Sequence, residues 1–325
     1  MSLELKDLAG FSEPAKKLLE MIQAAFGAAY KPRSIKSEAD ARAYERLAIA
    51  KADAEAERIK KFAEANTILG LAHQLDDGSG ELINRAKVRL AQREIEGQKN
   101  VESIIDKSIL ALPSSVSPEP VNPDWRRKFF IEAENICAED LQELWGRVLA
   151  GELARPGTFS LRTLEALKHI SQDEAEGFRV LCSLAMEYGW VAIPGHDLNS
   201  ALTDFGIDYN RILALRDAGL LLAGDNLAKF FKAPPDCDPG KHKVFLINNG
   251  ILIELSGPIL AHFSAPALIF SRAGSELQQL MSRSPNDSYL QRIGQFWRSS
   301  GITAKRGEPT SEQNGVSILS FEKDL

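Results

Sequence analysis

Residues Cys137–Phe178, CAEDLQELWGRVLAGELARPGTFSLRTLEALKHISQDEAEGF, determine the fold class of this chain. Apolar residues recur there at intervals of three and four positions, which is the pattern of helices with one buried face. On the first helix these residues are Leu141, Leu144, Trp145 and Val148. Pro156 and Gly157 form a turn, and Ser171 with Glu174 forms the capping box that begins a later helix. The segment from residue 124 to 195 is therefore predicted to be a helical bundle.

The chain before this bundle is predicted to begin with an amphipathic helix. Pro14 suits the first turn of a helix that starts at Ser12. Its apolar stripe consists of Leu18, Leu19, Ile22, Ala25, Phe26 and Ala29. Another surface must cover such a stripe. That surface is either the rest of the protein or, if Ser12–Tyr30 acts as a membrane effector, a lipid membrane.

Two long helices are predicted next. The first covers Ser37–Ala72 and is rich in alanine, and the second follows the turn at Asp76–Gly80 and ends near Leu112, before Pro113. We expect them to form a long antiparallel hairpin. Their mixed charges suit a solvated face, and the alternative is an oligomerisation surface.

The best candidate for a linker is Ser114–Pro123, SSVSPEPVNP, because its prolines and serines disfavour both helix and core. The sequence therefore predicts a long-helix region at residues 1–113, a linker at 114–123, a helical bundle at 124–195 and a last module at 196–325. Cleavage by proteases is expected in the linker.

The last module changes character and mixes helices with strands. Two short helices, Asp197–Phe205 and Asp208–Asp217, flank Gly206 as in a helix-turn-helix. Strands at Val244–Ile247 and Ile251–Leu255 flank an Asn-Asn-Gly turn. Further helices at Ser275–Met281 and Asp287–Ser299 and a strand at Val316–Phe321 are expected to follow. The prediction is a mainly α protein that ends in a winged-helix-like α+β module.

Composition favours a soluble cytoplasmic protein. The net charge of −6 among 325 residues argues against a surface that binds nucleic acid everywhere. The three cysteines lack the spacing of a disulfide framework or zinc ribbon. The start of the chain carries acidic residues rather than the pattern of a secretory signal, and the longest apolar run, Pro258–Phe270, is shorter than the roughly 20 residues of a spanning helix.

No catalytic motif is present in the sequence. The chain lacks a phosphate-binding loop, a dinucleotide-binding glycine motif, a nucleophile elbow and the paired histidines of a zinc protease. We therefore expect a protein without enzymatic activity, cofactor or metal.

DNA binding is the alternative that a helix-turn-helix raises. The expected recognition helix, DYNRILALRD, offers Arg211 and Arg216 as candidate contacts to nucleic acid. Asp208 and Asp217 at its two ends cancel this charge, so a protein-binding module is the preferred interpretation.

The stretch from Leu141 to Phe178, with FSEPAKKLLEMIQAAFGAAYKPRSIKSEADA before it and LIFSRAGSELQQL after it, resembles an uncharacterised bacterial family known as a domain of unknown function. It is also distantly similar to the abortive-infection alpha proteins. No catalytic residue comes with this resemblance, which implies a role in resistance to phage or mobile elements. Among the quoted residues, Glu152 and Arg162 lack an obvious packing role and are predicted to pair across the turn at Pro156-Gly157.

The leading hypothesis is a non-enzymatic interaction protein with a protein partner or self-association, in bacterial antiphage defence. Its candidate interaction residues are Glu152, Arg162, Arg211 and Arg216. A winged-helix DNA-binding regulator is the first alternative, and a membrane-acting effector is the second and weaker one.

Overall fold

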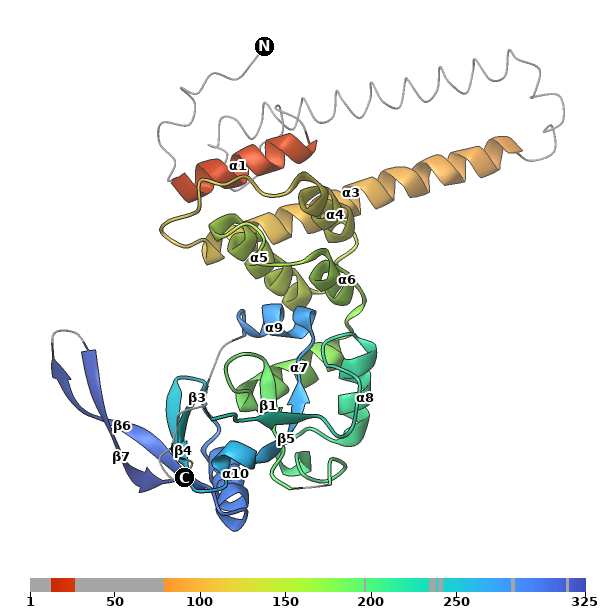
Figure 1. The fold of residues 1–325 in the computed structure, drawn as a ribbon. Coiled ribbons are helices and arrows are strands. Elements are labelled where there is room, and N and C mark those ends of the chain that lie inside the picture. Colours follow the sequence, from red (N-terminus) through yellow and green to blue (C-terminus); the bar gives the residue numbers. More distant parts are fainter. Residues whose placement is uncertain are drawn as a thin grey trace. The chain divides into compact units, whose positions relative to one another are not determined.

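The computed structural model describes residues 13–26, 79–195, 197–233, 238, 242–281, 284–313 and 316–325. These residues are mainly α-helical, with two small antiparallel sheets (Figure 1). The mainly α class predicted from the sequence is therefore confirmed. The chain divides into two compact units, Met1–Thr158 and Phe159–Leu325, and each is described below by itself.

Four described helices build the first unit: α1 (Glu13–Phe26), α3 (Ser79–Ala111), α4 (Pro123–Ala133) and α5 (Glu139–Ala154). Helix α3 packs on α4 and α5, and α1 packs on the same two helices. The second long helix predicted from the sequence is thus present as α3. Its expected partner in the hairpin, Ser37–Ala72, lies outside the described residues.

Aromatic residues form the core of the first unit. The Phe129 ring lies 5.1 Å from the ring of Trp125 and 5.1 Å from that of Trp145. Phe130 continues the cluster to α1, because its ring lies 4.9 Å from that of Phe26. Of the stripe predicted on the first helix, Leu18, Leu19 and Ile22 are buried here, whereas Phe26 is half-buried, Ala25 is exposed and Ala29 lies outside the described residues. These contacts attach α1 to its own protein.

Helices α3 and α5 come close together at Gly146. A Cβ atom at this position would lie 2.9 Å from Lys107 Cβ and 3.0 Å from Ser108 N. The absence of a side chain therefore permits the crossing. A polar contact accompanies it, in which Ser103 Oγ donates to Gln142 Oε1 at 2.7 Å.

The second unit contains helices α6 (Leu161–His169), α7 (Gln172–Leu184), α8 (Tyr209–Asp217), α9 (Arg272–Gln278) and α10 (Asp287–Ser299). Helix α6 packs on α9, and α7 packs on α8. The capping box predicted at Ser171 and Glu174 is present at the start of α7. The predicted bounds of α10 agree with the structure.

Seven described strands form the two sheets. The first sheet has the order β1-β5-β2, with β1 at Trp190–Ala192, β2 at Ala228–Phe230 and β5 at Ser264–Ile269. The second has the order β3-β4-β6-β7, with β3 at Lys243–Asn248, β4 at Ile251–Ser256, β6 at Thr303–Gln313 and β7 at Val316–Asp324. Neighbours in both sheets are antiparallel.

The hairpin predicted around Asn248-Asn249-Gly250 is confirmed as β3 and β4. Both Asn249 and Gly250 have positive φ angles, 46° and 87°, as a two-residue primed turn requires. The asparagine amides also end α7: Asn248 Nδ2 donates to Leu184 O and Ala185 O, and Asn249 Nδ2 donates to Ser183 O. These contacts satisfy carbonyl groups at the C-terminal end of α7, which stops at Leu184.

The prediction of an α-helix at Asp197–Phe205, the first helix of the expected helix-turn-helix, is wrong. The structure has turns there and a short 3₁₀ helix, η4, at Thr203–Phe205. Asp197 accepts hydrogen bonds from Asn199 N and Ser200 Oγ, and such local side-chain contacts compete with helix formation. The second helix is present as α8, capped by Asp208.

The units also divide the chain differently from the expected domains. Helices α4 and α5 pack on α1 and α3, whereas α6 and α7 pack on helices later in the chain. The boundary accordingly follows Thr158 and divides the segment 124–195 that was expected to be one bundle. Residues 114–123 lie within the first unit.

Candidate interaction sites

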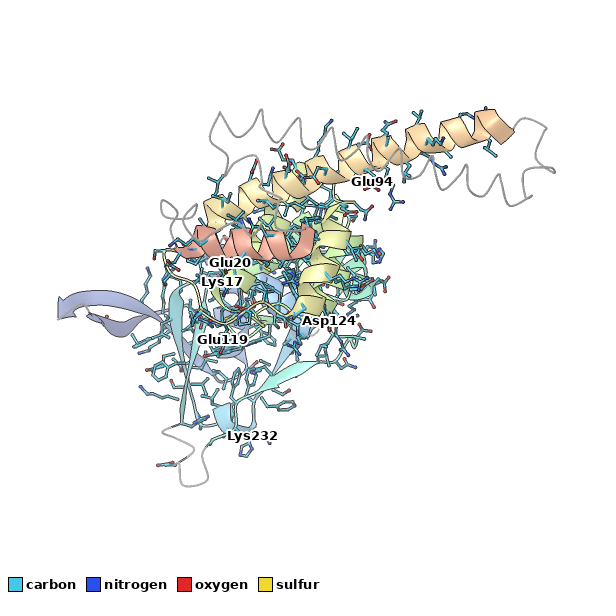
Figure 2. All side chains as sticks on the ribbon, turned by 90° about the horizontal axis from the view of Figure 1, so that it is seen from above. Lys17, Glu20, Glu94, Glu119, Asp124 and Lys232 are labelled. Carbon is cyan, nitrogen blue, oxygen red and sulfur yellow. The ribbon has the colours of Figure 1, made fainter. Side chains whose placement is uncertain are left out.

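The Lys17 side chain on α1 forms hydrogen bonds with the proline-containing loop that precedes α4. Its ammonium donates to Ser117 O and Glu119 O, at 2.5 and 2.6 Å, and to Leu153 O at 3.1 Å. Lys17 and Glu119 are labelled in Figure 2. Leu153 O belongs to the last turn of α5, where carbonyl groups lack partners within the helix. A cation at that end also suits the negative end of the helix dipole. One side chain therefore joins α1, the loop and α5.

A cavity of about 650 Å³ opens beside this lysine, between α1 and the loop. Its apolar lining comes from both sides and consists of Met21, Ala24, Val116, Pro118, Pro120, Val121 and Leu153. Its charged lining consists of Glu13, Lys16, Lys17, Glu20 and Arg126. The volume falls in the range of sites for small molecules.

Two of the cations in this cavity differ in their surroundings. Burial lowers the pKa of Lys17, although Glu119, Glu152 and Glu20 partly oppose this effect. Its three bonded acceptors are backbone carbonyls, and among the described residues no carboxylate bonds to it directly. Within the described part of the chain, the Arg126 guanidinium makes neither a hydrogen bond nor an ion pair. Of these two cations, Arg126 is the one whose charged group has no bonded partner among the described residues.

The sequence analysis did not identify Lys17 or Arg126. A lysine on the polar side of an amphipathic helix gives no sign that distant carbonyls surround it. The only local signal was the run of prolines in Ser114–Pro123, which we interpreted as a linker.

The N-terminal half of α3 is a second candidate surface. Figure 1 shows it extending beyond α4 and α5. Residues 85–96 are exposed without interruption. Large apolar side chains on this arm are open to solvent: Leu82 is 60% exposed, Val88 67%, Leu90 48% and Ile95 57%.

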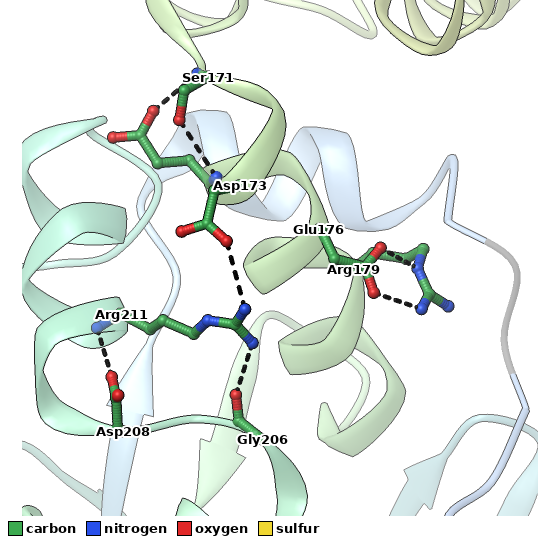
Figure 3. A network of polar contacts seen from close by, with 8 residues as sticks. Ser171, Asp173, Glu176, Arg179, Gly206, Asp208 and Arg211 are labelled. Carbon is green, nitrogen blue, oxygen red and sulfur yellow. Dashed lines mark hydrogen bonds and ion pairs between the residues drawn. The ribbon is translucent and has the colours of Figure 1, made fainter.

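The two arginines of the expected recognition helix make contacts within the second unit. Arg211 donates from its guanidinium to Gly206 O at 2.8 Å and pairs with Asp173 on α7 at 3.3 Å (Figure 3). Arg216 pairs with Asp225 at 2.7 Å and donates to Gly224 O at 2.6 Å. Only 10% of the Arg216 side chain is exposed. Both arginines therefore join α8 to neighbouring segments.

Glu152 and Arg162 fall in different units, and their pairing stays a prediction. Glu152 is buried, and its Oε1 accepts a hydrogen bond from Gly157 N at 2.7 Å. This bond supplies the packing role that the sequence did not reveal, since it fixes the turn after α5. Arg162 is exposed in the first turn of α6.

Glu276 is a buried carboxylate that the sequence analysis also missed. Located on α9, it accepts hydrogen bonds from Ser160 N at 2.6 Å, from Thr163 Oγ1 and from Arg272 Nε at 2.7 Å. Burial alone would raise the pKa of Glu276, but these hydrogen bonds outweigh it and lower the pKa. Glu276 therefore acts as an N-terminal cap of α6 supplied from another helix.

Metal and membrane sites were also sought among the described residues. No group of three or more histidine, cysteine, aspartate or glutamate side chains there could hold a metal ion. None of the described helices combines the length and the apolar character needed to cross a bilayer.

Part of the chain matches a known protein family. Residues 84–193 match a family described as a protein of unknown function, DUF2806. This stretch runs from within α3 to just beyond β1 and includes α4 to α7. No curated protein and no solved structure matches the chain. The resemblance to a domain of unknown function is therefore confirmed for these residues.

Proposed function

We propose that this chain is a non-enzymatic interaction protein that uses the exposed arm of α3 to bind a helical segment of a partner protein or of a second copy. The exposed apolar side chains on this arm are the observation that carries the proposal. Val88 and Ile95 are seven residues apart and lie on one face of the helix.

Burial of these side chains would favour association. Full burial of a valine or isoleucine side chain contributes about 1.5–3 kcal/mol to the free energy of association. A partner helix that packs on these side chains would remove them from water. Recognition of this kind uses apolar anchors spaced at three, four and seven residues. Charged residues beside the stripe, such as Arg89 and Glu96, can then set orientation and partner choice.

The test replaces both anchors with charge. Val88→Glu combined with Ile95→Glu should abolish concentration-dependent association in light scattering, or co-purification of the cellular partner. Gln92→Glu is the matched control, because it adds one carboxylate to the same exposed arm. Association that survives in the double variant as in the control would contradict the proposal.

The second unit is proposed to be a winged-helix-like module that reports or anchors this event. After α7 its elements follow in the order β1, η4, α8 and β2, then the β3–β4 hairpin and then β5. The sheet order β1-β5-β2 places β5 between β1 and β2. These features support a winged-helix arrangement in which the β3–β4 hairpin takes the place of the wing.

A DNA-binding regulator is the alternative function. The ion pairs of Arg211 and Arg216 disfavour it, because both guanidinium groups already bond to neighbouring segments. Binding to duplex DNA that weakens steeply with salt would favour this alternative.

Membrane action through α1 is the second alternative, and it requires release of side chains that are buried in the first unit. Binding to liposomes by the whole protein would support it. The proposed setting, antiphage defence, rests on the resemblance to abortive-infection alpha proteins. It predicts fewer phage plaques on cells that express this chain than on cells that express the arm double variant.

A further inference from the structure

The cavity beside α1 has the properties of a ligand site. Its volume of about 650 Å³ is lined by apolar residues from α1 and from the Val116–Val121 loop, and the charged residues lie among them. Such a combination of an apolar wall with few polar groups is typical of small-molecule sites.

Charge determines which ligand would fit. Three lysine and arginine residues and two glutamates line the cavity, so the balance is positive. Lys16 already pairs with Glu13 at 2.9 Å. The Lys17 ammonium directs its hydrogen bonds to carbonyl oxygens, and the charges of Glu119, Glu152 and Glu20 act on it. Arg126 is therefore the cation able to donate hydrogen bonds to a ligand.

We propose that this cavity binds a small amphipathic carboxylate, with its acid group on the Arg126 guanidinium and its apolar body against Met21, Val116 and Val121. A planar guanidinium matches the two oxygens of a carboxylate. This proposal is independent of the α3 arm.

Sodium octanoate is the probe, titrated calorimetrically into the whole protein. We expect saturable binding with one site, whereas 1-octanol should bind at least tenfold more weakly. Arg126→Gln should weaken octanoate binding by roughly 10- to 100-fold, as expected for loss of hydrogen bonds to a charged group. Arg127→Gln is the matched control, since Arg127 is the exposed neighbour outside the cavity.

A second variant covers the case in which Arg126→Gln fails to fold. Ala24 lines the cavity from the exposed side of α1, so Ala24→Phe should fill the cavity and abolish binding without changing the core. The proposal is overturned if octanoate does not saturate, if octanol binds equally well, or if Arg126→Gln or Ala24→Phe binds octanoate as the wild type does.

Discussion

At two helix ends, single side chains that are distant in sequence bond to the backbone groups of the helix. At the N-terminus of α6, the side chain of the N-cap residue Ser160 makes no capping hydrogen bond, and a carboxylate from α9 accepts the Ser160 N–H. In the same way, asparagine amides from the β3–β4 turn satisfy the last carbonyl groups of α7. Both contacts replace local capping by tertiary contact.

Trp145 is predicted to be the most sensitive position of the first unit. Trp145→Ala should lower the free energy of unfolding by about 3–5 kcal/mol, because the ring is fully buried against Phe129. Trp145→Phe should cost less, since the indole N–H has no hydrogen-bond partner in the described structure. Denaturant unfolding measures both. Ile131→Ala, on the exposed side of α4, is the control, and an equal effect there would contradict this prediction.

Glu276 is predicted to make the second unit sensitive to acid. Because its folded pKa lies below the ordinary value of 4.5, the ionised carboxylate stabilises the fold above that pH. This contribution is lost as pH falls through the folded pKa. Glu276→Gln should destabilise the unit by about 1–3 kcal/mol at neutral pH, through weaker hydrogen bonds.

The difference in melting temperature between wild type and Glu276→Gln should then shrink as the pH falls from about 5 to about 3. Asp217→Asn, which removes an exposed carboxylate from α8, controls for general charge effects. A difference that stays constant across this range would show that ionisation of Glu276 does not stabilise the fold.

At the scale of elements, helix ends and crossings depend on few contacts. Helix α1 is short, and isolated helices of this length are marginal in water. Its stability therefore comes from its buried stripe and from the three hydrogen bonds of Lys17.

Lys17→Met is predicted to release the loop before α4. The unfolding free energy should fall by about 1–3 kcal/mol, and proteases should cut within Ser114–Pro123 faster than in the wild type. Limited proteolysis with mass spectrometry locates the cut. Lys16→Met is the matched control, because Lys16 pairs with the exposed Glu13. Equal cleavage in the two variants would show that Lys17 does not hold the loop.

At the scale of the whole molecule, the packing of α4 and α5 determines where the units divide. Both helices bury their aromatic residues together with α1 and α3. A boundary at 114–123 would separate these helices from their partners and expose Trp125, Phe129 and Trp145.

Two fragments distinguish the boundaries. Residues 159–325 should fold by themselves and unfold cooperatively, as circular dichroism on heating can measure. Residues 124–325 should instead aggregate or bind an apolar dye, because α4 and α5 lack the surface that covers them. The opposite result, with only the longer fragment folded, would place the boundary in the Ser114–Pro123 segment.

The sequence by itself determined the helices whose signals are local. The apolar spacing of α5, the capping box of α7 and the bounds of α10 all depend on residues within a few positions. The asparagine-glycine turn of the β3–β4 hairpin is equally local. These elements were predicted because short-range periodicity and capping dominate their formation.

Only the tertiary structure decided the short strands and the candidate sites. Strands β1 and β2 have three residues each, which is too short for alternation to be recognised, and β5 supplies their partners from far along the chain. Lys17 and Ser117 are 100 residues apart in sequence. Contacts at such separation leave no periodic trace, because they depend on how already formed helices pack. For that reason only the packed structure identifies Lys17, Arg126 and Glu276 as candidate functional or structural residues.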